Sequence, residues 1–198
     1  MILVMIMLKI YLYSANNLES FFKLPETIEN HINSYNEEQK LISASNYQKL
    51  SIKLIESNLD INHLYFSENG KPLIDGVNIS LAHNVNYYGF AISKTQNVGL
   101  DIEDFRRFDS SKLSKSILND NEYQEYLSFQ NKLTFLASKW CEKEALGKML
   151  GTGINKDVLK MSAKYKKFSI INHDLIAVVS DIDINDIELY IDDQKSEF

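Results

Sequence analysis

Short runs of alternating apolar and polar residues are separated by longer stretches with helical spacing. The alternation predicts strands over residues 9–13, 78–83, 87–93 and 97–103, and again over 168–171, 175–179 and 187–191. Residues 26–59 contain no Gly or Pro and repeat Leu and Ile at three- and four-residue spacing, which predicts a helix. Helices are also predicted over 18–24 and over most of 110–150, with Asn119 or Asp120 capping one and Gly151 ending the last.

Each half of the chain therefore follows the order strand, helices, strands. A faint repeat supports this division, since Ile79–His83 followed by Ala91 resembles Phe168–His173 followed by Ala177. The pattern predicts an α+β fold with two similar halves, an N-terminal subdomain over 1–96 and a C-terminal subdomain over 97–198. The strand over 97–103 would lie near their boundary.

The apolar N-terminus is expected to be a strand. Residues 1–8 have no basic segment before them and are too short to cross a bilayer, and no other segment approaches that length. One cysteine, Cys141, excludes an internal disulfide framework and fits a reducing compartment. A cytoplasmic protein is therefore expected, with Cys141 as a small packing residue.

The net charge of −6 comes from one end of the chain. Residues 181–198 hold seven acidic residues against Lys195, so the rest is neutral overall, with a basic stretch over 156–167. A neutral body with basic patches is compatible with phosphate ligands. No basic run is long enough to indicate nucleic acid, and no segment indicates a membrane partner.

A D-x-E motif lies on one predicted strand. Val98, Leu100 and Ile102 alternate there with Gly99, Asp101 and Glu103, so the apolar set is buried on one face and both carboxylates lie on the other. Taken alone, such a motif is usually a solvated polar face.

A second motif falls on a predicted helix about forty residues later. Trp140, Glu144 and Lys148 are one turn apart along a single stripe. Taken alone, Glu144 and Lys148 are an ordinary surface pair and Trp140 is a core residue. If the stripe faces the strand, three carboxylates and an ammonium converge, and oxygen ligands of that kind favour Mg²⁺.

Four motifs in this order resemble the 4′-phosphopantetheinyl transferase superfamily. They are Gly70-Lys71-Pro72, Ser80-Leu81-Ala82-His83, Gly99-Leu100-Asp101-Ile102-Glu103, and the Trp140 to Lys148 segment W-C-E-K-E-A-L-G-K. In its length and in the mid-chain position of the D-x-E strand, the sequence resembles the larger surfactin-type branch. Members of that branch are monomeric, with two similar subdomains in one chain related by a pseudo-twofold axis. The small pair usual after the histidine is replaced by Asn84-Val85.

The resemblance implies transfer of 4′-phosphopantetheine from coenzyme A to a serine of an apo acyl or peptidyl carrier protein, releasing adenosine 3′,5′-bisphosphate. It implies that Asp101, Glu103 and Glu144 bind Mg²⁺. Glu144 would also act as the base, and Lys148 would stabilise charge on the pyrophosphate.

The resemblance also implies residues that bind coenzyme A. Lys71 and His83 match positions near its 3′-phosphate, Lys49 or Lys40 would add to that pocket, and Lys143 would assist at the pyrophosphate. Three other interpretations stay open: an inactive homologue that binds a carrier protein, a Mg²⁺-dependent nucleotide hydrolase, and a plain structural α+β protein. The sequence does not identify the carrier or its pathway.

Overall fold

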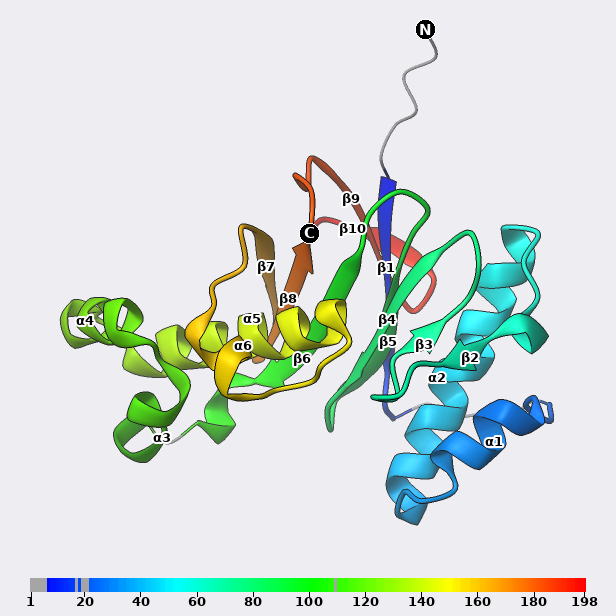
Figure 1. Cartoon of the computed structure of the whole chain (residues 1–198), viewed down its shortest axis with the longest axis horizontal. Coiled ribbons are helices and arrows are strands. Elements are labelled where there is room, and N and C mark those ends of the chain that lie inside the picture. The colour runs from blue at the N-terminus through cyan, green and yellow to red at the C-terminus, as the bar shows by residue number, and fades with distance from the viewer. Residues whose placement is uncertain (1–6, 17, 19–21, 109) are drawn as a thin grey trace, which may run out of the picture.

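The computed structural model describes residues 7–16, 18, 22–108 and 110–198. Strands form the centre of the molecule, with α1 and α2 on one side and α3 to α6 on the other (Figure 1). The order of layers is helix, sheet, sheet, helix, so each sheet presents one face to the other sheet and one face to its own helices.

The N-terminal half begins with strand β1 and continues through two helices into a group of strands. Its elements are β1 Met7–Ser14, α1 Glu26–Ile32, α2 Glu37–Glu56, the short 3-10 helix η1 Ile61–His63, β2 Tyr65–Phe66, β3 Pro72–Leu73, β4 Asn78–His83 and β5 Tyr87–Ser93. The Asn36 side chain accepts a hydrogen bond from the Gln39 amide and so caps α2.

The C-terminal half repeats the order of strand, helices and strands. Its elements are β6 Val98–Asp104, η2 Phe105–Arg107, α3 Ser110–Ile117, α4 Asp120–Ser128, α5 Lys132–Leu150, α6 Lys156–Lys160, β7 Tyr165–Ile171, β8 Asp174–Ser180, β9 Asp186–Ile191 and β10 Gln194–Ser196. Asn119 and Glu122 form a capping box at the start of α4, which confirms the predicted cap. Gly151 ends α5 in the left-handed conformation.

The two larger sheets share a pattern. The strand order β10-β9-β1-β5-β4 contains β1-β5-β4, and the other sheet is β6-β8-β7. In both, the first strand of a half pairs antiparallel with the second strand of the hairpin that follows the helices. The last strands, β9 and β10, cross back to the N-terminal sheet, where β9 runs parallel to β1. A boundary at 96/97 thus separates the helix layers but not the sheets.

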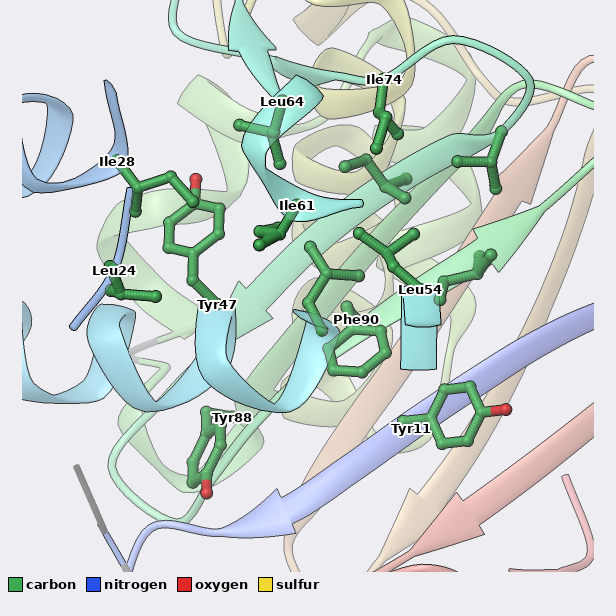
Figure 2. Close-up of a cluster of buried hydrophobic side chains, with 14 of the residues drawn as sticks. Tyr11, Leu24, Ile28, Tyr47, Leu54, Ile61, Leu64, Ile74, Tyr88 and Phe90 are labelled. Carbon is green, nitrogen blue, oxygen red and sulfur yellow. The ribbon is translucent and has the colours of Figure 1, made fainter. Parts of the chain in front are cut away.

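Three apolar layers hold the structure together. Between α2 and the first sheet lies the cluster that includes Leu54, Tyr47 and Phe90 (Figure 2). The layer between the two sheets includes Ile10 of β1 with Leu100 of β6. A third cluster lies between α5 and β8. Burial of apolar area in these layers is the main stabilising contribution.

The predicted elements are largely confirmed, with two differences. Residues 33–36 interrupt the helix predicted over 26–59, because Asn36 starts a new helix there. The helix predicted over 18–24 is wrong where it can be checked, since residues 18 and 22–24 are not helical, while 19–21 lie outside the described residues. The predicted first strand is confirmed from Met7, and residues 1–6 lie outside the described part. Within the described ranges, no helix combines the length and apolarity needed to span a bilayer.

Candidate active site at the junction of β6 and α5

Small residues let helix α5 approach strand β6 closely. Ala137, Cys141 and Ala145 follow one another at four-residue spacing, are fully buried, and pack against this sheet. On the strand, a Cβ at Gly99 would lie 1.8 Å from the carbonyl oxygen of Ala145, so only glycine fits at that position. Cys141 is a packing residue, as the sequence predicted.

The neighbouring stripe of α5 meets the carboxylates of β6. Lys148 Nζ lies 2.7 Å from Asp101 Oδ1, and the indole Nε1–H of Trp140 donates to Glu103 Oε1 at 2.9 Å. The apolar residues Val98, Leu100 and Ile102 are buried on the other face, as predicted.

Two expectations about individual side chains need correction. Asp101 does not lie on an exposed strand face, because α5 covers it and leaves only 5% of the residue exposed. Trp140 packs beside the apolar cluster of α3, α4 and α5, as a core residue would, but it also orients a site carboxylate.

Burial and mutual repulsion raise the proton affinity of the carboxylates. The pKa of Glu103 rises to about 7, mainly through burial and then through the negative charge of Asp101. The pKa of Glu144 is also raised, by burial and by Asp101. Burial alone would lower the pKa of Lys148, but Asp101 and Glu144 raise it overall. The ammonium therefore stays charged and offsets part of the negative charge.

The chemistry of this cluster fits a hard divalent cation. Asp101, Glu103 and Glu144 offer only oxygen donors, and Asp101 Oδ2 is buried without a hydrogen-bond partner. In the present side-chain conformations Lys148 and Trp140 occupy one oxygen each of Asp101 and Glu103. The described residues contain no group of three or more His, Cys, Asp or Glu side chains already gathered for a metal ion. A bound cation would relieve the repulsion that raises the carboxylate pKa values.

A cleft of about 450 Å³ runs from this cluster between the two halves. Its size falls in the usual range for small-molecule sites. The C-terminal half contributes Gly147, Lys148 and the loop after α5. The N-terminal half contributes α1, α2, the turn before β3, and β4; the polar side chains from that half include His31, Tyr35, Gln39, Ser43, Asn46, Lys71 and His83.

Lys71 and His83 both line the cleft. Lys71 Nζ donates to the carbonyl oxygen of Met149 at 2.6 Å, at the C-terminal end of α5, where the helix dipole favours a cation. Burial lowers its pKa. His83 is the last residue of β4 and is exposed at the cleft. The pKa of its imidazole is lowered, first by partial burial and then by the positive charge of Lys148. The imidazole is thus close to the carboxylate cluster.

Lys40 and Lys49 do not line the cleft, which differs from the expectation for α2. Lys40 forms a surface pair with Glu37 at 3.2 Å. Lys49 lies over the ring of Tyr13, 4.7 Å from its centroid. The face of α2 that does line the cleft carries Gln39 and Ser43. Both side chains are uncharged, so the positive charge expected of a phosphate-binding residue does not mark them in the sequence.

Lys143 has a structural role in place of the predicted role at the pyrophosphate. Its side chain is fully buried, and its ammonium contacts Glu122 at 2.9 Å and the carbonyl oxygens of Leu159 and Met161. These contacts fasten α4 and α6 to α5 and leave no donor for a ligand.

Comparison with known proteins gives one family model and several relatives that match part of the chain. The model of the 4′-phosphopantetheinyl transferase superfamily matches residues 97–191. A holo-acyl-carrier-protein synthase of Streptococcus suis is 38% identical over 65 residues, which cover 29% of this chain and 55% of the relative. The corresponding protein of Buchnera aphidicola is 29% identical over 111 residues, 50% of this chain and 87% of the relative. The corresponding protein of Erwinia tasmaniensis is 34% identical over 64 residues, which cover 32% of this chain and 47% of the relative.

The matched segment contains both motifs of the β6–α5 cluster. The chain spans about half the length of the streptococcal and Erwinia relatives and most of the Buchnera one. The resemblance to the superfamily is confirmed, and the assignment to the surfactin-type branch stays a prediction. Residues 97–191, which include the carboxylate strand and the helix that covers it, match the model of the 4′-phosphopantetheinyl transferase superfamily.

Proposed function

We propose that this chain transfers 4′-phosphopantetheine from coenzyme A to a serine hydroxyl of an apo carrier protein, with Mg²⁺ as the cofactor. The observation that carries the proposal is the position of Lys148, which contacts Asp101 of the carboxylate cluster and also lines the cleft. The superfamily match and the relatives named holo-acyl-carrier-protein synthases support it.

In this mechanism the serine oxygen attacks the phosphorus that bears the pantetheine arm, and the bond to the bridging oxygen of adenosine 3′,5′-bisphosphate breaks. Glu144 accepts the serine proton as the general base. Lys148, which stays charged, stabilises the negative charge on the pyrophosphate oxygens. Trp140 holds Glu103 in place throughout.

Asp101, Glu103 and Glu144 would hold the Mg²⁺, which would supply neutralisation of the pyrophosphate charge. Lys71 and His83 would bind phosphate groups of coenzyme A from the opposite wall. Both walls come from one chain, which supports the expectation of a monomer that works without a partner copy. We expect it to act in the cytoplasm, where its co-substrate and carriers occur.

The test is mass spectrometry of several apo carrier proteins incubated with the protein, coenzyme A and Mg²⁺. We expect a mass gain of one phosphopantetheine group on the carrier serine, and loss of the gain when EDTA replaces Mg²⁺. Release of adenosine 3′,5′-bisphosphate without any carrier would indicate a hydrolase. A carrier that binds but gains no mass would indicate an inactive homologue.

A further inference from the structure

The turn that follows His83 is tied to the opposite half of the molecule. Asn84 is buried, and its side-chain oxygen accepts hydrogen bonds from the amides of Asn86 and Tyr87, both at 2.9 Å. Its Nδ2 donates to Asp174 Oδ1 at 2.5 Å. The side chain of Asn84 therefore shapes the β4–β5 turn and also anchors it to β8.

Asn86 adds a second contact with the same carboxylate. Its Nδ2 lies 3.0 Å from Asp174 Oδ1 and 3.1 Å from Asp174 Oδ2. Asp174 is only 2% exposed and opens β8, opposite Asp104 at the end of β6. Hydrogen bonds to a buried carboxylate are stronger than neutral ones, so this link is a firm one.

The hydrogen bonds of Asn84 and Asn86 to Asp174 connect the two halves where, in the described part of the chain, no backbone hydrogen bonds join their sheets. β4 and β6 belong to different sheets, although they run side by side. Ser80 Oγ accepts a hydrogen bond from the Leu100 amide at 3.0 Å and joins the two strands near one end. At the other end, directly after His83, the β4–β5 turn is joined to the start of β8 by the hydrogen bonds of Asn84 and Asn86 to Asp174.

We propose that the Asn84–Asn86–Asp174 link is a positioning device for the cleft: it fixes His83 of one half relative to Asp101 and Lys148 of the other. The proposal rests on the proposed function, in which coenzyme A contacts both walls at once. A ligand that bridges two walls binds best when their separation is set in advance, because it then loses less binding energy in ordering them. Asp174 itself touches no substrate.

The variant Asn86→Ala tests this with little risk to folding, because it removes an amide from a partly exposed turn and leaves the shaping role of Asn84 intact. Asn97→Ala is the matched control. Asn97 Nδ2 donates to Asp181 Oδ2 at 2.8 Å, and both residues belong to the C-terminal half. Each variant removes one side-chain amide from a carboxylate. Asn86→Ala does so across the two halves, and Asn97→Ala does so within one half.

The measurements are calorimetric affinity and KM for coenzyme A and for dephospho-coenzyme A, which lacks the 3′-phosphate. We expect Asn86→Ala to weaken the affinity for coenzyme A by roughly 3- to 10-fold, which is the contribution of one net hydrogen bond. The value of kcat should stay unchanged. Binding of dephospho-coenzyme A should change little, because this ligand lacks the 3′-phosphate, which is the group that His83 is proposed to bind. Asn97→Ala should match the parent for both ligands.

Other outcomes overturn the proposal in recognisable ways. Equal weakening of both ligands, or the same effect in Asn97→Ala, would show general destabilisation in place of positioning. Unchanged affinity in Asn86→Ala, with a parent that binds and transfers normally, would refute the positioning role alone. A parent that neither binds coenzyme A nor modifies a carrier would refute the proposed function, and the positioning role with it.

Discussion

Gly99→Ala should disable the site from a position that carries no functional group. The added Cβ would lie 1.8 Å from the carbonyl oxygen of Ala145 and 3.0 Å from Met149 Cβ. Ordinary contact begins near 3.4 Å, so β6 and α5 would have to separate by roughly 1.5 Å. Such a shift would stretch the 2.7 Å contact between Lys148 and Asp101 beyond hydrogen-bond length.

The expected costs differ in size for stability and for activity. Overpacking of this kind destabilises by about 1–3 kcal/mol. Misplacing catalytic groups by about 1 Å can reduce the rate of reaction roughly 100-fold. Carrier modification followed by mass spectrometry gives the rate, and urea unfolding gives the free energy of unfolding.

Gly76→Ala provides a matched control for the loss of stability. Gly76 has a φ of +84°, and a Cβ there would meet nothing within 4 Å. The substitution strains the backbone by about 1–2 kcal/mol without touching α5, so this variant should be destabilised and fully active. A folded Gly99→Ala protein that turns over within a few-fold of the parent would refute the claim that this close approach assembles the site.

Three further predictions concern the side chains of the site. Glu144→Gln should lower kcat by about 10²–10⁴-fold while coenzyme A binding, measured by calorimetry, largely survives; near-normal turnover would show that Glu144 is only a surface partner of Lys148. Lys71→Ala should raise KM for coenzyme A more than for dephospho-coenzyme A, and equal effects on both would place Lys71 elsewhere on the ligand. Folding raises the pKa of Glu103 from 4.5 to about 7, so the folded chain holds this proton more tightly and its free energy of unfolding should fall as pH rises through that window. Glu103→Gln should remove this part of the slope in urea unfolding with EDTA, and an unchanged slope would contradict the assignment.

The sequence could predict the β6–α5 cluster because short periods determine it. A two-residue repeat fixes which face of a strand carries Asp101 and Glu103, and a four-residue repeat aligns Trp140 with Lys148. These repeats do not say whether the Trp140–Lys148 face of the helix is turned toward the strand. The structure answers this question through Gly99 and the small residues of α5, whose close approach needs no polar signal at all.

The opposite wall could not be predicted in the same way, because the rotation of α2 about its axis decides which residues reach the cleft. Asn46 contributes to that rotation together with the buried Tyr47 and Leu50. The buried Nδ2 of Asn46 donates to the carbonyl oxygens of Ala82 and Gly89, on β4 and β5. With Asn46 held against the sheet, Ser43 and Gln39 turn toward the cleft, and Lys40 pairs with Glu37 on the surface. The positively charged Lys40 therefore lies on a different face of the helix from the residues that line the cleft. Asn46 is an uncharged amide whose partners lie 36 and 43 positions away, so its contacts leave no local pattern in the sequence.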